Sequence, residues 1–200
     1  MNNIQQIRHL LEFSSGDDFY LLQVLKRKKE HPELGRNSQV IKTYYIKSIP
    51  YLDKIMTEIK GICDLFNARA YINLNKRSYR NVAFHTLGKI SNQIMNEDYD
   101  NVAKAYNSTA GTYGNAHGDK KWIIDVDDSE FYCPDFLTTI DFCMPKGDKF
   151  LAKIPTKNGY HLVVKPFNIN EMEKFMKELG TPFDSQMLHK DALTLLYFPE

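Results

Sequence analysis

The fold is decided by a β-hairpin, which is predicted by the stretch Phe150-Leu151-Ala152-Lys153-Ile154-Pro155-Thr156-Lys157-Asn158-Gly159-Tyr160-His161-Leu162-Val163-Val164. Two largely apolar runs flank a polar turn that contains Asn158-Gly159. Because Asn-Gly readily takes the positive φ of a tight turn, the pattern favours two antiparallel strands joined by this turn.

Helices are expected on both sides of this hairpin. Apolar residues at helical spacing predict helices over residues 4–13, 52–66 and 83–94. In the third of these, the apolar stripe consists of Ala83, Leu87, Ile90 and Ile94. Asn168 with Glu171 three residues later predicts a capping box for a further helix, which Gly180 ends.

Strands alternate with these helices. They are expected over residues 40–46, 70–74, 122–127 and 194–198. Residues 19–25 could form a helix, but we interpret them as the partner of 40–46 in a long hairpin, and residues 107–119 are expected to be a mobile loop. The predicted fold class is therefore α/β (α+β), with a mixed β-sheet flanked by helices.

The domain organisation follows from the absence of repeats, low-complexity tracts and linkers along the chain. We predict one domain over residues 1–200. Its N-terminal α/β portion, residues 1–120, includes candidate template contacts, and residues 121–200 hold the candidate catalytic motifs.

Composition indicates a globular protein, because 42% of the 200 residues are hydrophobic and 12% are aromatic. Lys and Arg number 26 against 25 Asp and Glu, so the net charge of +1 excludes global attraction to nucleic acid or membrane. No apolar run is long enough to span a membrane, and residues 1–6 lack the features of a secretory signal. We expect a cytoplasmic protein with no membrane partner.

The cysteines Cys63, Cys133 and Cys143 are odd in number and widely spaced. This pattern argues against a disulfide framework and against a zinc ribbon. Reduced thiols in the core are expected.

Two acidic residues end the apolar strand Trp122-Ile123-Ile124-Asp125-Val126-Asp127. Side chains two apart on a strand share a face, so the carboxylates of Asp125 and Asp127 can bind one hard cation between them. An exposed strand end that runs into a turn explains the same residues without a metal, because Asp and Ser are common in turns. The residues alone leave both interpretations open.

A second polar cluster lies in the hairpin turn. Thr156, Lys157, Asn158 and His161 bring together a hydroxyl, a cation, exposed turn amides and an imidazole, which suits an anion such as a triphosphate. An ordinary hairpin turn with a partly exposed histidine is the alternative. Asp191, before the last strand, is a candidate third ligand that is otherwise a cap or a loop residue.

In this order along the chain, Asp-x-Asp, Gly-Tyr-His and a lone Asp resemble the three motifs of the archaeo-eukaryotic primase superfamily. That family includes primase-polymerases of plasmids and phages and the polymerase domains of bacterial end-joining ligases. The resemblance covers residues 121–200. Residues 71–77 are also similar to the strand and polar turn that some members place before the first motif.

The resemblance implies a DNA primase or polymerase that adds nucleotides to a 3′-hydroxyl on a single-stranded template. It implies Asp125, Asp127 and Asp191 as ligands of two Mg²⁺ or Mn²⁺ ions, and His161 as a contact of the nucleoside triphosphate. Two such metals activate the attacking hydroxyl and neutralise the leaving pyrophosphate. Many members have Ser two residues before the motif-two histidine, where this chain has Gly159.

Basic residues that could track a template backbone form two groups. Lys26, Arg27 and Lys28 belong to a run of four bases, and Lys76, Arg77 and Arg80 form the second group. A solvated surface balanced by nearby glutamates explains the first group equally well.

Two other functions stay open. In a haloacid-dehalogenase-like phosphatase, whose nucleophile motif is similar, Asp125 would be the nucleophile and Asp127 a general acid, but no later acidic pair follows. A catalytically degenerate primase-like module would bind nucleic acid or nucleotide without turnover. Within the polymerase interpretation, the alternatives are a minimal enzyme, a subunit that needs a replication partner protein, and an inactive remnant.

Overall fold

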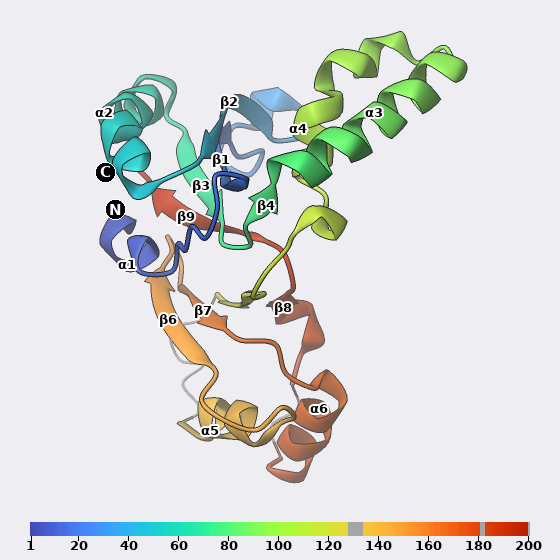
Figure 1. Cartoon of the computed structure of the whole chain (residues 1–200). Coiled ribbons are helices and arrows are strands. Elements are labelled where there is room, and N and C mark those ends of the chain that lie inside the picture. The colour runs from blue at the N-terminus through green and yellow to red at the C-terminus, as the bar shows by residue number, and fades with distance from the viewer. Residues whose placement is uncertain (128–133, 181–182, 200) are drawn as a thin grey trace. The chain divides into compact units, whose positions relative to one another are not determined.

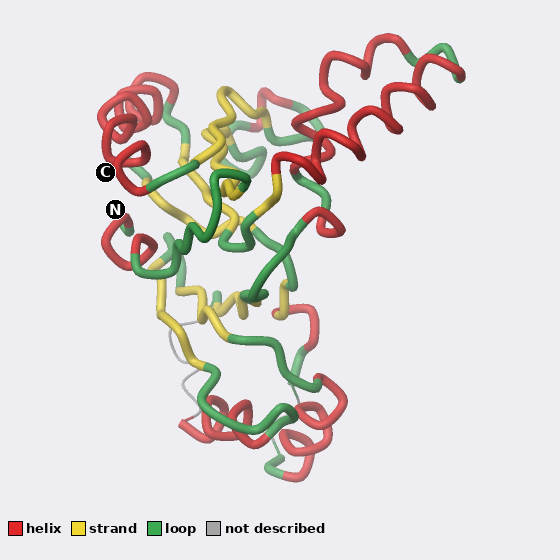
Figure 2. The backbone as a smooth tube through the Cα atoms, viewed as in Figure 1, coloured by secondary structure: helices red, strands yellow, loops and turns green. Residues whose placement is uncertain are grey.

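The computed structural model describes residues 1–127, 134–180 and 183–199. Within them the chain forms two compact units (Figures 1 and 2). Unit 1 consists of Met1–Gly118 and Leu195–Glu200, and unit 2 consists of Asp119–Thr194.

Unit 1 is built on a sheet with the strand order β2-β1-β3-β9, in which β4 also pairs with β1. The strands are β1 (Asp18–Lys26), β2 (Gln39–Ile46), β3 (Arg69–Asn73), β4 (Arg77–Ser78) and β9 (Leu193–Tyr197). The first two residues of β9, Leu193 and Thr194, belong to unit 2, and the rest of the strand belongs to unit 1. β1 pairs antiparallel with β2, from Tyr20 opposite Ile46 to Lys26 opposite Gln39. The expected long hairpin is therefore confirmed, and the helical alternative for residues 19–25 is wrong.

The helices of unit 1 are α1 (Ile4–Arg8), α2 (Ile49–Phe66), α3 (Tyr79–Met95) and α4 (Ala105–Ala110), with single turns of 3-10 helix at η1 (Pro32–Leu34) and η3 (Tyr113–Asn115) and a longer one at η2 (Tyr99–Lys104). The predicted helix 52–66 is confirmed as α2. Its N-cap Ser48 accepts a hydrogen bond from the backbone of Tyr51, and Asn67 ends the helix in the left-handed conformation at φ 46°.

Three sequence predictions for unit 1 need correction. α1 is shorter than predicted, because the chain turns at His9, although Leu10 and Leu11 are still buried. The expected loop 107–119 contains helical turns, α4 and η3. α3 forms as predicted, but it buries Val82 and Thr86 rather than the predicted apolar stripe.

The N-terminal segment of unit 1 is held against β9. The backbone N–H and the side-chain amide of Asn3 donate to the carbonyl oxygens of Leu196 and Leu195, each at 2.9 Å. The amino group of Met1 donates to the carbonyl oxygen of Phe198 at 2.8 Å. Residues from the two ends of unit 1 therefore lie side by side, and unit 2 is inserted between them in the sequence.

Unit 2 follows a β-α-β-β-α-β order, that of the ferredoxin-like split-βαβ unit. Its elements are β5 (Trp122–Val126), α5 (Pro134–Phe142), β6 (Phe150–Pro155), β7 (Tyr160–Val164), α6 (Ile169–Glu178), η4 (Ser185–Met187) and β8 (Leu188–His189). The strand order is β6-β7-β5-β8, and the pairings are antiparallel. The hairpin predicted over residues 150–164 is confirmed.

Both helices of unit 2 cover one face of its sheet. Trp122, Ile124 and Val126 of β5 point to this face and belong to one buried cluster with Ile140 of α5 and Met172 of α6. Because side chains alternate along a strand, Ile123 and Asp125 point to the opposite face. The helices of unit 2 therefore do not cover the face of the sheet that holds Asp125.

The predicted N-cap of α6 is confirmed in part. The side chain of Asn168 accepts from the backbone of Asn170 and Glu171, at 3.1 and 3.3 Å. Glu171 does not complete the reciprocal half of the box, because its carboxylate accepts from the backbone of Met144 at 2.7 Å. Gly180 follows the helix at φ 75°, as expected of a C-terminal glycine.

The fold class is confirmed as α+β, with two antiparallel sheets in place of the one mixed sheet that the sequence predicted. Cys63 and Cys143 are buried free thiols, which agrees with the expected reduced core, and Cys133 lies outside the described residues. Burial raises the pKa of both thiols.

Candidate functional site

The first pair of predicted site residues meets across two neighbouring strands of unit 2. Asp125 of β5 lies directly opposite His161 of β7. Oδ1 of Asp125 is 3.2 Å from Nε2 of His161, and the two side chains are 37% and 12% exposed. The antiparallel register thus brings together two of the predicted site residues.

The imidazole of His161 also has a partner on its other side. Nδ1 lies 2.9 Å from Oγ1 of Thr194, a residue with no exposed surface. Both ring nitrogens are therefore occupied, and the ring is fixed between Asp125 and Thr194. Sequence reasoning placed Thr194 only at the start of a strand, since nothing in the local pattern indicates a contact with a residue 33 positions away.

The second acid, Asp127, lies next to the hairpin turn. It is exposed at the end of β5. A Cβ atom built on Gly159 would lie 1.9 Å from the carbonyl oxygen of Val126 and 3.1 Å from the carbonyl carbon of Asp127. The backbone of the turn therefore packs directly on the residues that connect the two acids.

The turn itself is closed by a backbone hydrogen bond of 2.9 Å from Thr156 to the carbonyl oxygen of Gly159. Lys157 and Asn158 are exposed at its tip, and Thr156 is half-buried. Gly159 does not have the positive φ that the sequence predicted for this turn. Its lack of a side chain permits the close approach to β5.

Asp191 lies in the connection between β8 and β9 and is half-buried. In the β5–β8 ladder, His189 is opposite Ile123. Across the described ranges, no group of three His, Cys, Asp or Glu side chains is arranged as a metal site. Convergence of Asp191 with Asp125 and Asp127 stays a prediction.

The first basic group lies where β1 ends. Lys26 is half-buried, with its ammonium 5.9 Å from the ring centroid of Phe66, and Arg27 is also half-buried. Lys28 is exposed. Lys28 is therefore the most exposed of the three basic residues.

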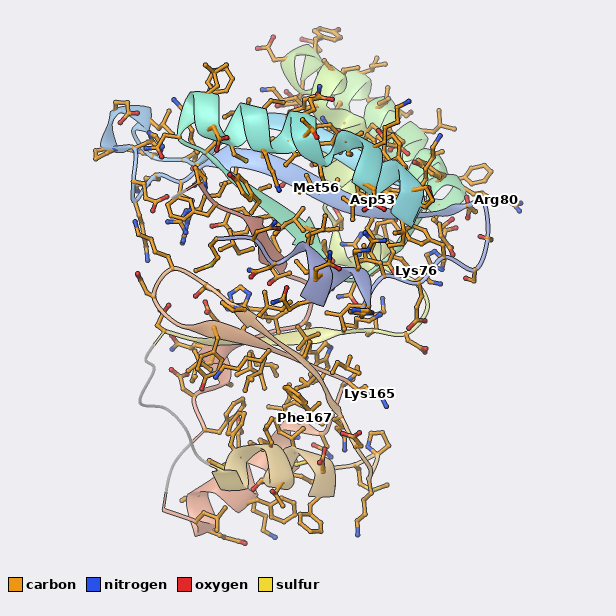
Figure 3. All side chains as sticks on the ribbon, turned by 90° about the vertical axis from the view of Figure 1, so that its left-hand side faces the viewer. Asp53, Met56, Lys76, Arg80, Lys165 and Phe167 are labelled. Atoms are coloured by element: carbon orange, nitrogen blue, oxygen red, sulfur yellow. The ribbon has the colours of Figure 1, made fainter. Side chains whose placement is uncertain are left out.

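The second basic group divides into three different environments (Figure 3 labels Lys76 and Arg80). Arg77 is fully buried, and its guanidinium donates to the carbonyl oxygens of Ala110 and Asn75, each at 2.9 Å. The prediction that Arg77 contacts nucleic acid is wrong, because a side chain without exposed surface cannot reach a phosphate. Arg80 is exposed on α3.

Lys76 belongs to a buried polar network around Asp18 that sequence reasoning missed. Nζ of Lys76 donates to the hydroxyl of Ser14 at 2.8 Å and lies 3.4 Å from Oδ2 of Asp18. Asp18 also accepts from the backbone of Ser14 at 2.6 Å and of Ser15 at 3.1 Å. The sequence Ser14-Ser15-Gly16-Asp17-Asp18 indicated only a turn. Lys76, the partner of Asp18, lies 58 residues further along the chain.

The protonation of Asp18 is set by this network. Burial alone would raise the pKa of a side chain that is 1% exposed, but hydrogen bonds from Ser14 and Ser15 and the charge of Lys76 hold the pKa well below its usual range. Nε2 of His117 lies 3.3 Å from Oδ1 of Asp18, although it is not aligned for a hydrogen bond. The network thus keeps a buried carboxylate charged and stabilises unit 1.

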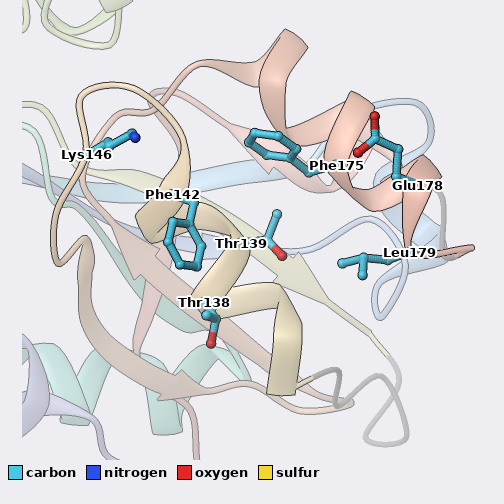
Figure 4. A pocket seen from close by; sticks show the side chains of 7 residues that line it. All are labelled: Thr138, Thr139, Phe142, Lys146, Phe175, Glu178 and Leu179. Carbon is cyan, nitrogen blue, oxygen red and sulfur yellow. The ribbon is translucent and has the colours of Figure 1, made fainter.

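An apolar pocket lies away from Asp125, between α5 and α6, and has a volume of about 500 Å³ (Figure 4). It is lined by Thr138, Thr139, Phe142, Lys146, Phe175, Glu178 and Leu179. None of the predicted site residues lines it.

Comparison of the chain with protein-family models, with curated proteins and with solved structures found no match. In the part of the chain that the structure describes, no helix combines the length and the apolar character that crossing a bilayer requires.

Proposed function

We propose that the chain is a metal-dependent nucleotidyltransferase of the DNA primase-polymerase type, which adds nucleotides to a 3′-hydroxyl on a single-stranded template. The observation that carries this proposal is the pairing of Asp125 with His161 across β5 and β7. In this proposal Asp125 belongs to the first motif of the primase superfamily and His161 to the second, and the direct contact of these residues, 36 positions apart in the chain, supports it. A cytoplasmic location belongs to the same proposal, because nucleoside triphosphates and template are present there.

The donor chemistry of β5 fits Mg²⁺ or Mn²⁺. Asp125 and Asp127 supply carboxylate oxygens, and Asp127 is exposed. In this proposal they hold the metal ions, with Asp191 as the predicted third ligand. Bound metal ions would acidify the attacking hydroxyl and neutralise the triphosphate.

The hairpin turn supplies the nucleotide contacts in this proposal. Lys157 and Asn158 are exposed at its tip, beside the end of β5, where a cation and turn amides can bind phosphate oxygens. Thr156 adds a hydroxyl. The close packing of Gly159 on Val126 fixes the distance between these groups and the acids.

His161 has a positioning role as well as a nucleotide contact. Its Nε2 atom and a bound cation would compete for the carboxylate of Asp125, because both are attracted to the same negative charge. When Asp125 binds a cation, Nε2 becomes available to a phosphate oxygen, while the contact with Thr194 keeps the ring in place. Metal binding and nucleotide binding are then coupled through one side chain.

The test is incorporation of labelled nucleotides on a primed single-stranded template, with and without Mg²⁺ or Mn²⁺. The isosteric variants Asp125→Asn and Asp127→Asn should each lower the rate by at least about a hundredfold, since they remove metal ligands. Asp148→Asn is the matched control, because Asp148 is an exposed aspartate of the same unit outside the site. Equal activity of all three variants would contradict the assignment.

A second candidate function is a primase-like module that binds nucleotide or nucleic acid without turnover. The observation that favours it is the contact of Asp125 with His161, because this contact can stabilise the sheet without a role in catalysis. Nucleotide or template binding without incorporation, under any divalent metal, would select this function. Absence of both binding and incorporation would eliminate both candidates.

A further inference from the structure

α3 exposes a row of large apolar side chains. The helix buries Val82 and Thr86 on the side that faces α4, beside which it runs (Figure 1). On the other side, Phe84, Leu87 and Ile94 are 62%, 64% and 51% exposed. The sequence placed Leu87 and Ile94 in the apolar stripe of this predicted helix, and the structure leaves both exposed.

The spacing of this row is that of a helix-pairing seam. Phe84, Leu87, Ser91 and Ile94 follow one another at intervals of three, four and three residues, which is the heptad pattern of the a and d positions. A heptad row faces another helix along its length. Gly88 lies beside the row with no atom within 4 Å of an added Cβ, so the middle of the helix can be approached closely.

Charges at the two ends of α3 indicate the direction of the partner. Arg80 lies in the first turn, and Glu97 and Asp98 follow the last turn, and all three are exposed. The carboxylate of Asp17 accepts from the backbone N–H of Arg80 at 2.9 Å, and Asp98 is the N-cap residue of η2, so each end of the helix has a local partner, while the side chain of Arg80 stays exposed. An antiparallel copy of the same helix would bring the exposed side chain of Arg80 to the end of its partner that holds Glu97 and Asp98, where opposite charges attract.

One register satisfies both the seam and the charges. Suppose that two copies of α3 pair antiparallel about a two-fold axis that crosses the helix at the level of Lys89. Phe84 then faces Ile94 of the second copy, and Leu87 faces its Ser91. The same register carries Arg80 to the end that holds Glu97 and Asp98. Lys89 itself stays outside the seam, because its ammonium donates to the hydroxyl of Ser108 on α4, at 2.6 Å.

We propose that the protein forms a two-fold symmetric homodimer through antiparallel pairing of α3. A patch that is complementary to itself under a two-fold rotation is what a dimer interface of this kind requires. A nucleic acid is a poorer occupant, because the apolar row has acidic residues at one end and a single arginine at the other. The proposal does not depend on the enzymatic function proposed above.

The test is sedimentation equilibrium of the full chain over a wide concentration range, without nucleic acid. The wild-type protein should show a monomer–dimer equilibrium, and Leu87→Asp should be monomeric at the same concentrations. Leu65→Asp is the matched control, because Leu65 is a 76% exposed leucine on α2, and it should dimerise as the wild type does. Circular dichroism verifies that each variant is folded.

Charge reversal tests the direction of pairing. Arg80→Glu alone, and Glu97→Lys with Asp98→Lys, should each weaken the dimer by about tenfold or more, because like charges then meet. The variant that combines all three reversals should regain most of the wild-type affinity. A monomeric wild-type protein, a control that loses the dimer as Leu87→Asp does, or failure of the combined reversal to restore it would each overturn the proposal.

Discussion

A Cβ atom at Gly159 would lie 1.9 Å from the carbonyl oxygen of Val126, closer than any side chain can approach a backbone oxygen. The tip of the β6–β7 hairpin is therefore fixed on the end of β5. This contact sets the position of the candidate phosphate-binding residues relative to Asp125 and Asp127. It is the geometric basis of the candidate site.

Gly159→Ala is expected to destabilise the protein by about 2 kcal/mol or more, because the clash is with backbone atoms that cannot rotate away. Urea denaturation measures the free energy of unfolding. Gly61→Ala on α2, where an added Cβ meets no atom within 4 Å, should be neutral or stabilising. A Gly159→Ala protein of wild-type stability would mean that the hairpin tip is not held against Val126.

Lys157→Ala is expected to raise KM for the nucleotide by about tenfold with a smaller effect on kcat, because an exposed cation contributes to phosphate binding rather than to the chemical step. Steady-state incorporation kinetics at varied nucleotide concentration separate the two constants. Lys146→Ala, in the loop after α5, is the control and should change neither. A loss confined to kcat would instead assign Lys157 to the chemical step.

Replacing Lys26, Arg27 and Lys28 together by alanine should flatten the salt dependence of single-strand binding. Each lost phosphate contact lowers the slope of log K against log salt by about 0.7. Fluorescence anisotropy with a labelled oligonucleotide at several salt concentrations measures this slope. Lys54→Ala, an exposed lysine of α2, is the control, and an unchanged slope in the triple variant would make the run an ordinary solvated surface.

The Asp18 network should make stability depend on pH in the acid range. The folded pKa of Asp18 is lowered, so its contribution is complete above the unfolded value of about 3.9 and is lost as pH falls toward the folded value. Asp18→Asn should therefore cost about 2 kcal/mol at pH 7, and the difference from wild type should shrink below about pH 4. Unfolding free energies at pH 7 and pH 3 test this, and a constant difference would show that the charge of Asp18 is not what stabilises the turn.

Local pattern predicted most strands and helices correctly, because their stabilising contacts follow the chain's own periodicity. α2 shows this well, since its apolar stripe and its cap at Ser48 are both visible in sequence. α3 forms as predicted, but its buried face differs from the predicted one. Its apolar residues have helical spacing, but spacing does not reveal whether a face meets the core, and Val82 and Thr86 are buried instead.

The candidate site was predictable only as far as it depends on strand register. Asp125 and His161 were predicted separately, and their contact follows from the pairing of β5 with β7. The contact of His161 with Thr194 and the burial of Arg77 could not be predicted, because both depend on long-range packing. A basic residue in a polar turn looks the same in sequence whether it faces solvent or the carbonyl oxygen of Ala110.

The order of synthesis gives the position of β9 a further significance. β9 is the neighbour of β3 in the unit 1 sheet, yet most of it is translated only after unit 2. During translation, the edge of β3 therefore stays open while the ribosome makes all of unit 2, and an open edge can pair with another nascent chain. Slow elongation through residues 119–194 should lengthen this exposure, so the aggregation of nascent chains should depend on codon choice within that inserted segment.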